Sequence, residues 1–211
     1  MLIRETVSSG YLGALKDTLE GRTFMQVTNV TFPIAEGNVN TGPEFHRYFE
    51  GFKFPDGRTG RWWIENRVNA LLRQGGEYWD LIRRNGQWTY LIAALKGMIA
   101  GTMPRWNANR LLITLFDPEK HLHKSRAPTP PCLVTLDFKP VRDQLTLIAT
   151  WRSQYTDTKG YGNLYSLALL LLQVSEMSGF KPGELYSVAN KPILRWSPRK
   201  VGRSLLEGAL K

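Results

Sequence analysis

Residues 132–153 read CLVTLDFKPVRDQLTLIATWRS, and this stretch decides the fold. Apolar and polar residues alternate over Leu133–Phe138, and the alternation returns over Leu145–Trp151. A two-residue period is typical of a strand with one buried face. Arg142-Asp143 stands between the two segments as a turn, so the stretch predicts an antiparallel hairpin.

The segment that follows the hairpin predicts a central helix. Asn163 can cap a helix over Leu164–Met177 that ends at Gly179. Apolar residues lie on nearly every side of this helix, which indicates that it is buried. A strand over Glu184–Val188 and a terminal helix over Pro198–Leu210 come next.

The segment that precedes the hairpin alternates between the two element types. Its apolar patterns predict strands over residues 23–32 and 111–116, and helices over residues 12–19, 62–72, 78–82 and 88–99. Residues 33–60 predict a loop with one short helix, and residues 117–131 a basic, proline-rich loop. The whole predicts an α+β fold, a mixed sheet with helices over one face, in a single domain of residues 1–211.

Composition narrows the class of protein. A chain of 211 residues with 42% hydrophobic and 22% charged residues is typical of a folded domain. Its one cysteine excludes an internal disulfide framework and a multi-cysteine metal site, and it fits a cytoplasmic location. We expect no membrane contact, because there is no signal-peptide pattern and no apolar run near the ~20 residues that span a bilayer. The net charge of +10 favours nucleotides or nucleic acid as partners, although a solvated basic surface explains it equally well.

The single cysteine, Cys132, follows Thr129-Pro130-Pro131. The two prolines restrain the backbone and can hold the thiol at the edge of a strand. The preceding loop carries basic residues, among them His121, His123, Lys124 and Arg126. Positive charge favours the reactive thiolate, whereas a lone cysteine is also commonly a small buried apolar residue. The residue alone leaves both interpretations open.

The order of motifs resembles a known family. Pro131-Cys132, a hairpin, Arg152-Ser153 and a helix that opens at Asn163 resemble the C-terminal half of thymidylate synthases and the related pyrimidine hydroxymethylases. Three further segments are similar to that family: NRLLITLFD at 109–117 to its Arg-Arg segment and strand, GEL at 183–185 to the start of a late strand, and EFHRYFEG at 44–51 to the helix with its catalytic glutamate. The resemblance covers roughly residues 86–190.

The resemblance implies a thymidylate-synthase-like fold, a homodimer and one-carbon transfer, either methylation or hydroxymethylation, to C5 of a pyrimidine nucleotide. Cys132 would add to C6 of the ring and so make C5 nucleophilic. Glu44 would move protons through water. The expected co-substrate is 5,10-methylenetetrahydrofolate, with Asp157 as its contact.

The resemblance also implies how the nucleotide is held. Arg110, Arg152 and Ser153 would bind its 5′-phosphate, with Arg110 reaching the partner's site across the dimer. Asn163 would bind the edge of the base, since an amide offers both a donor and an acceptor. In the family an amide at this place goes with uracil, so Asn163 points to a uracil nucleotide. The same residue is equally well explained as a helix cap.

Several positions depart from the family pattern. Leu133 stands where the family has histidine after the cysteine, and Trp151 stands where it has glutamine before Arg-Ser. Tyr155 replaces the folate-contacting aspartate, with Asp157 two residues away. The late Gly-Asp-x-His-x-Tyr motif that contacts the sugar is absent, and residues 189–194 read ANKPIL in its place. The thiol and phosphate parts match, whereas the sugar and folate parts do not.

Two other functions therefore stay open. One is a relative without catalysis that binds nucleotides or scaffolds a complex. The other is nucleic-acid binding, because basic residues interleave with aromatic ones between residues 47 and 67. The basic residues are Arg47, Lys53, Arg58, Arg61 and Arg67, and the aromatic residues are Tyr48, Phe54, Trp62 and Trp63. A solvated basic face is the simpler explanation for this cluster.

Overall fold

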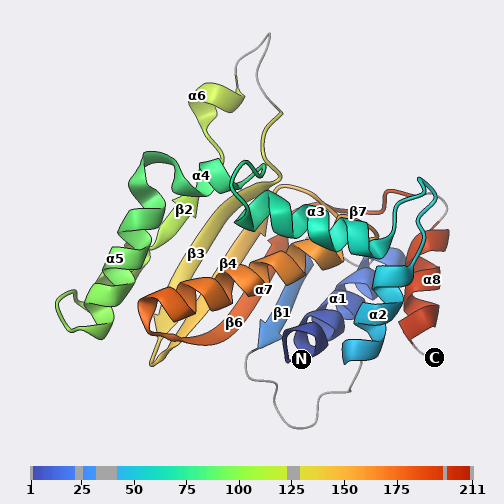
Figure 1. The fold of residues 1–211 in the computed structure, drawn as a ribbon. Coiled ribbons are helices and arrows are strands. Elements are labelled where there is room, and N and C mark those ends of the chain that lie inside the picture. The colour runs from blue at the N-terminus through green and yellow to red at the C-terminus, as the bar shows by residue number, and fades with distance from the viewer. Residues whose placement is uncertain (1, 22–25, 32–41, 123–128, 197–198, 210–211) are drawn as a thin grey trace.

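The predicted hairpin forms the middle of a mixed sheet (Figure 1). A computed structural model describes residues 2–21, 26–31, 42–122, 129–196 and 199–209. In it, β3 (Leu133–Val141) and β4 (Gln144–Trp151) pair antiparallel around the Arg142-Asp143 turn. Arg142 takes a φ of 57°, in the left-handed region that favours glycine. The predicted hairpin and its turn are confirmed.

The sheet has five strands in the order β1-β6-β4-β3-β2. The outer strands are β1 (Gln26–Thr31) and β2 (Leu112–Thr114), and β6 (Lys181–Ala189) lies between β1 and β4. The pair β4–β6 is parallel and the other three pairs are antiparallel. A parallel pair needs a crossover connection, and α7 (Lys159–Ser178) provides it. The mixed sheet and the α+β class are confirmed.

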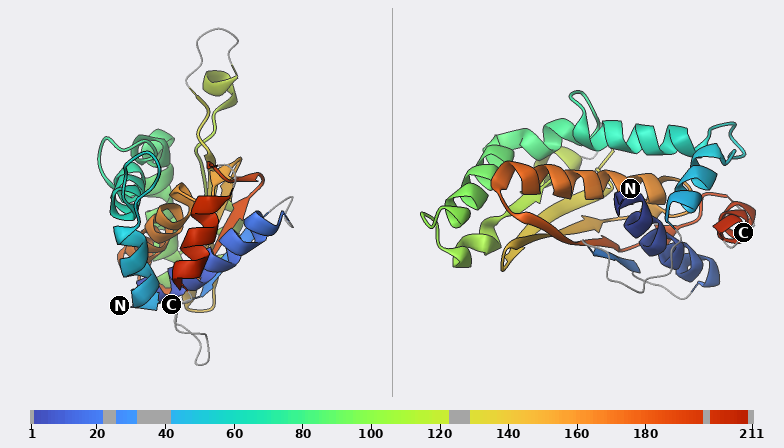
Figure 2. Two further views of the ribbon diagram at one scale, coloured as in Figure 1. Left: turned by 90° about the vertical axis from the view of Figure 1, so that its right-hand side faces the viewer. Right: turned by 60° about the horizontal axis from the view of Figure 1, so that its bottom comes forward.

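Helix α7 is the centre of the core, as its apolar sequence predicts. It lies against the sheet, α3 (Gly60–Leu72) lies over it, and α5 (Gln87–Ile99) lies at its side, next to β2 (Figure 1 and Figure 2). Leu147 and Leu185, on the parallel pair, are fully buried on the face that α7 covers. The residues on the other face are only partly buried or exposed in β2, β3 and β6. The helices therefore cover one face of the sheet.

The predicted start of this helix is wrong. α7 begins at Lys159, so Asn163 lies inside it and is not its cap. Gly160 and Gly162 indicate a loop in the sequence, yet they allow close packing here. A Cβ on Gly162 would lie 2.8 Å from the Trp63 carbonyl oxygen of α3, and a Cβ on Gly160 would lie 3.3 Å from the Tyr11 ring. Tertiary packing thus outweighs the helix propensity of glycine.

The remaining elements lie around this layer. They are α1 (Leu2–Glu20), α2 (Gly42–Gly51), α4 (Trp79–Arg83), α6 (Pro118–His121), α8 (Lys200–Ala209), two 3-10 turns (Arg84–Gly86 and Arg105–Arg110), and the small parallel pair β5 (Gln154–Tyr155) and β7 (Pro192–Ile193). The first helix is longer than predicted, β2 is shorter, and α6 occupies part of the predicted 117–131 loop. Of the helices that the structure describes, none is both long and apolar enough to cross a membrane.

The junction between α2 and α3 depends on one glycine. A Cβ on Gly60 would lie 1.6 Å from the Phe49 carbonyl oxygen. Gly60→Ala is therefore expected to lower the free energy of unfolding by about 3 kcal/mol or more, because the two backbones must separate. Urea denaturation measures this.

Gly13→Ala is the matched control, since Gly13 lies in α1 and has nothing within 4 Å of its would-be Cβ. It should raise the stability by about 0.5–1 kcal/mol through helix propensity. Equal effects of the two substitutions would contradict the packing at Gly60.

Candidate functional site

Cys132 lies immediately before β3, half-buried, where the central hairpin ends. Its Sγ is 3.7 Å from the Ser153 Oγ, and its carbonyl oxygen accepts a 2.8 Å hydrogen bond from the Arg152 N–H. Hairpin pairing thus brings together the two motifs that the sequence separates by about twenty residues. The structure therefore places Cys132, Arg152 and Ser153 together, as a shared site requires.

The Arg152 side chain holds the backbone that leads to the thiol. Its Nε donates to the Pro131 carbonyl oxygen at 3.3 Å, and its Nη2 donates to that of Pro130 at 3.0 Å. These two bonds, together with the fixed φ of proline, restrain the approach to Cys132. Arg152 therefore has a positioning role, and part of its guanidinium is already engaged.

Charged and phenolic side chains interact electrostatically with the thiol. Burial raises the pKa of Tyr78, and the charges of Glu77 and Cys132 raise it further. Burial also lowers the pKa of Lys159, in the first turn of α7, and the charge of Arg67 acts in the same direction. The charges of Glu77 and Cys132 oppose this shift at Lys159. These five groups therefore share one electrostatic site.

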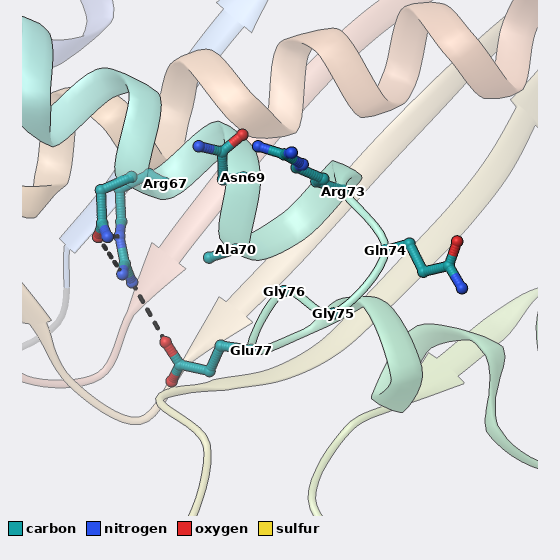
Figure 3. A pocket seen from close by; sticks show the side chains of 9 residues that line it. Arg67, Asn69, Ala70, Arg73, Gln74, Gly75, Gly76 and Glu77 are labelled. Atoms are coloured by element: carbon teal, nitrogen blue, oxygen red, sulfur yellow. Dashed lines mark hydrogen bonds and ion pairs between the residues drawn. The ribbon is translucent and has the colours of Figure 1, made fainter.

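Glu77 connects two cavities beside this cluster. The smaller, of about 320 Å³, lies at the C-terminal end of α3, and Glu77 and Arg67 both line it (Figure 3). The Arg67 guanidinium is buried, donates to the Asn66 Oδ1 and points at the Glu77 carboxylate, 3.5 Å away. The larger, of about 600 Å³, lies between α4 and α6, and Glu77 and Pro131 line it. Cys132 itself lines neither cavity, but its neighbour Pro131 lines the larger one, so that cavity adjoins the chain at the thiol.

Asn163 and Asp157 are buried. Asn163 is 4% exposed within α7 and lines neither of these two cavities. Asp157 is 1% exposed, and its Oδ1 and Oδ2 accept hydrogen bonds from the backbone N–H groups of Arg195 (2.9 Å) and Trp196 (3.1 Å). Burial raises the pKa of Asp157, and these bonds counteract the shift. Asp157 therefore anchors the chain after β7, which does not fit a contact to a cofactor.

Arg110 lies far from the thiol within one chain, and Glu44 lies outside both cavities. Arg110 is exposed at the end of the second 3-10 turn, and its neighbour Leu111 accepts a hydrogen bond from the Phe138 N–H. Phe138 lies six positions after Cys132 in the chain, a distance of about 20 Å at the usual rise of a strand. Glu44 is exposed on α2, which adjoins the Gly60 end of α3, whereas Glu77 follows the opposite end. Glu44 lines neither of the two cavities, and its neighbour Phe45 packs on Tyr161 of α7, with 5.5 Å between the ring centres.

The basic cluster between residues 47 and 67 is smaller at the surface than predicted. Arg67, Trp63 and Phe54 are buried, so they cannot contact a nucleic acid. Arg58 lies over the Trp62 ring at 4.1 Å, and Arg61 remains exposed. Of the basic loop ahead of Cys132, His121 is described, whereas His123, Lys124 and Arg126 lie outside the described residues.

The sequence does not indicate a place in this site for Glu77, Tyr78 and Lys159, and it indicates Arg67 only as part of the basic cluster between residues 47 and 67. None stands in a motif, and each reaches the site through tertiary packing. One local pattern indicates a turn here: Gly75-Gly76 follows the end of α3 and directly precedes Glu77. Gly76 packs against the end of α3, where a Cβ would lie 2.2 Å from the Asn69 carbonyl oxygen. This turn sets the position of Glu77.

No protein-family model matches the chain, and no curated protein matches it. The function must therefore be argued from the site itself.

The charges of Lys159 and Cys132 act on each other. Lys159→Met is expected to slow alkylation of Cys132 by iodoacetamide at neutral pH by about threefold to tenfold, because a nearby positive charge is lost. The chain has one cysteine, so the total alkylation rate measures this residue directly.

Lys159→Arg keeps the charge and should keep most of the rate. Lys96→Met removes an exposed lysine on α5 and is the charge control. An unchanged rate in Lys159→Met would show that the ammonium does not influence the thiol.

Proposed function

We propose that the protein transfers a one-carbon group to C5 of a pyrimidine nucleotide through a covalent adduct on Cys132. One observation carries the proposal: the only thiol lies 3.7 Å from the Ser153 hydroxyl, at the end of the hairpin, within a cluster that contains a lysine, an arginine and a glutamate. Such a group of nucleophile, cation and acid is typical of activated cysteines. The resemblance to thymidylate synthases and pyrimidine hydroxymethylases supplies the substrate class.

The chemistry begins with the thiolate. Its sulfur forms a bond to C6, and the C5–C6 π electrons move toward the C4 carbonyl oxygen to give an enolate. C5 then attacks a one-carbon donor at the oxidation level of formaldehyde. Loss of the C5 proton to a base restores the C5–C6 double bond and expels the thiolate. If water adds to the transferred carbon, the product is a hydroxymethyl pyrimidine. A methyl product instead needs a hydride from the donor on that carbon.

Glu77 is our candidate for the base in place of Glu44. Its carboxylate lines both cavities, and its charge acts on Tyr78 and Lys159 as that of Cys132 does. A carboxylate there can take the C5 proton through a water molecule. The Arg67 guanidinium, 3.5 Å away, holds it in place.

Folate fits the site less well than the nucleotide does. Both Asp157 oxygens are taken by backbone N–H groups, so the residue assigned to folate is not available to it. We therefore specify the donor by oxidation level only and give folate no step. A uracil base likewise requires a contact other than the buried Asn163 unless the second turn of α7 moves.

A homodimer would complete this site. The sheet face turned away from α7 carries half-buried Ile148, Tyr186 and Val188, and Leu112 and Val141 are exposed large apolar residues. Apolar groups on an uncovered sheet face favour association with a second sheet. We propose that two copies join through this face and that Arg110 serves the partner's site, because it is about 20 Å from its own thiol.

Nucleic-acid binding has less support. The exposed part of the basic cluster reduces to Arg47, Lys53, Arg58 and Arg61 around Trp62, and Arg58 already covers one face of that ring. Exchange of the hydrogen at C5 with water distinguishes an enzyme from a relative that only binds nucleotides, because the exchange requires the covalent adduct.

The decisive measurement is release of tritium to water from C5-labelled dUMP, UMP, dCMP or CMP. We expect at least one of these to exchange with the wild-type chain, because the enolate can be protonated at C5 and then lose tritium without a donor. Cys132→Ser should lower the rate by about a thousandfold or more, since the nucleophile is lost. No exchange from any of the four, with or without a one-carbon donor, would refute the proposal.

Two glutamate variants test the base. Glu77→Gln should slow the exchange by about a hundredfold, within the usual range for a general base. Glu44→Gln is the matched control on α2 and should leave the rate unchanged. The opposite ranking would return the role to Glu44.

Sedimentation velocity at micromolar concentration tests the dimer. We expect a species of twice the 24.1 kDa chain mass. Ile148→Lys places a charge on the uncovered face and should give monomers, because an unpaired charge in an interface is costly. A wild-type chain that sediments only as a monomer would exclude the dimer.

A further inference from the structure

The larger cavity beside the thiol has two walls of different chemistry. Residues of α4 and its flanks form one wall, residues of α6 form the other, and the segment that leads to Cys132 closes one side. The lining residues are Glu77, Asp80, Leu81, Arg84, Lys120, His121, Thr129 and Pro131. The volume of about 600 Å³ lies in the usual range for small-molecule sites.

The carboxylates around this cavity are each balanced by an arginine. Glu77 is 3.5 Å from the Arg67 guanidinium, and Asp117 is 3.0 Å from that of Arg84. The charge of Asp80 counteracts the fall that burial causes in the pKa of Arg83. Lys120 is the further cation at this cavity. Its Nζ is 3.9 Å from the Asp117 carboxylate, and its side chain is 65% exposed. The α6 wall therefore presents an exposed cation whose ion pair with Asp117 is long.

The backbone fixes the tautomer of His121. Its Nδ1 accepts a 2.8 Å hydrogen bond from the Asp117 N–H. A nitrogen that accepts a hydrogen bond carries no proton, so the neutral ring carries its proton on Nε2. Asp117 also caps α6, because its Oδ1 accepts from the N–H groups of Glu119 and Lys120. One aspartate thus holds the short helix, from which both Lys120 and His121 line the cavity.

We propose that Lys120 and His121 bind the phosphate of the nucleotide, a phosphate monoester, in this cavity. A phosphate offers only acceptors at its charged oxygens, which complements an ammonium and an imidazole N–H. This deepens the proposed function and rests on it for the identity of the rest of the ligand. It also replaces Arg152 as the principal phosphate ligand, since two of the Arg152 nitrogens already bind the proline carbonyls.

The placement brings the base to the side of the cavity formed by the chain just before Cys132. Pro131 lines the cavity and is bonded to Cys132, and Glu77 lines the α4 wall. A nucleotide whose phosphate lies at α6 therefore extends its ring toward the sulfur and the proposed base. Orientation of this kind is how remote binding groups contribute to rate.

Imidazole ¹⁵N NMR of the full chain tests the site directly. The chain has three histidines, and the spectrum of His121→Asn identifies the His121 signals. We expect the free protein to show the Nε2–H tautomer at His121, and both inorganic phosphate and dUMP to shift that signal. Deoxyuridine lacks the phosphate and should not shift it.

Calorimetry measures the contribution of each residue. Lys120→Met and His121→Asn should each weaken dUMP binding about tenfold, the usual effect of losing one hydrogen bond to a charged group. Deoxyuridine binding should not change. Asparagine can still accept the Asp117 N–H through its Oδ1, so His121→Asn keeps the local fold. Lys96→Met is the matched charge control and should bind as the wild type does.

The outcomes separate this inference from the proposed function. Unchanged dUMP affinity in both variants, or a loss only in Arg152→Gln, would overturn the phosphate site even where tritium exchange proceeds. A His121 signal that responds to neither inorganic phosphate nor dUMP would also overturn it. A response at His121 without tritium exchange would support the phosphate site and refute the covalent chemistry.

Discussion

The hydrogen bond from the Arg152 N–H to the Cys132 carbonyl oxygen is the constraint on which the site depends. It extends the pairing by one step, from Leu133 at the start of β3 and Trp151 at the end of β4. The thiol and the Ser153 hydroxyl are therefore placed by backbone pairing rather than by a flexible loop. The Arg152 guanidinium adds a second restraint through the carbonyls of Pro130 and Pro131. Preorganisation of this kind is what a reactive group requires.

The other side of the site depends on close backbone packing. Gly162 lets α7 approach α3, and Gly76 lets the chain turn tightly over the end of α3. The first contact sets the place of Arg67 and the second that of Glu77. Side chains from three separate segments thus reach one cluster because glycines bring their backbones together. The chemistry of the site and the stability of the core are coupled through these contacts.

The sequence was sufficient for much of the fold, because alternation over 133–138 and 145–151 and the apolar α7 are local patterns. It was sufficient for the association of Cys132 with Ser153, because hairpin register follows from the turn. It failed where tertiary packing decides. Glycines at 160 and 162 suggested a loop, yet they begin a helix, and Asp157 proved to anchor backbone N–H groups. Glu77 could not be found without the path of the chain after α3, and Glu44 was placed by resemblance alone.

The hairpin tip has a further consequence. Arg142 adopts a left-handed backbone conformation, which costs a residue with a side chain about 1 kcal/mol or more. This strained turn lies at one end of β3, and the thiol lies at the other, about 30 Å away by strand rise. The same hairpin therefore has a strained residue, whose replacement by glycine would stabilise the fold, at one end and the thiol at the other. A substitution that removes this strain could offset the loss of stability caused by substitutions around the thiol. The site can therefore tolerate more substitutions than the present stability of the fold allows.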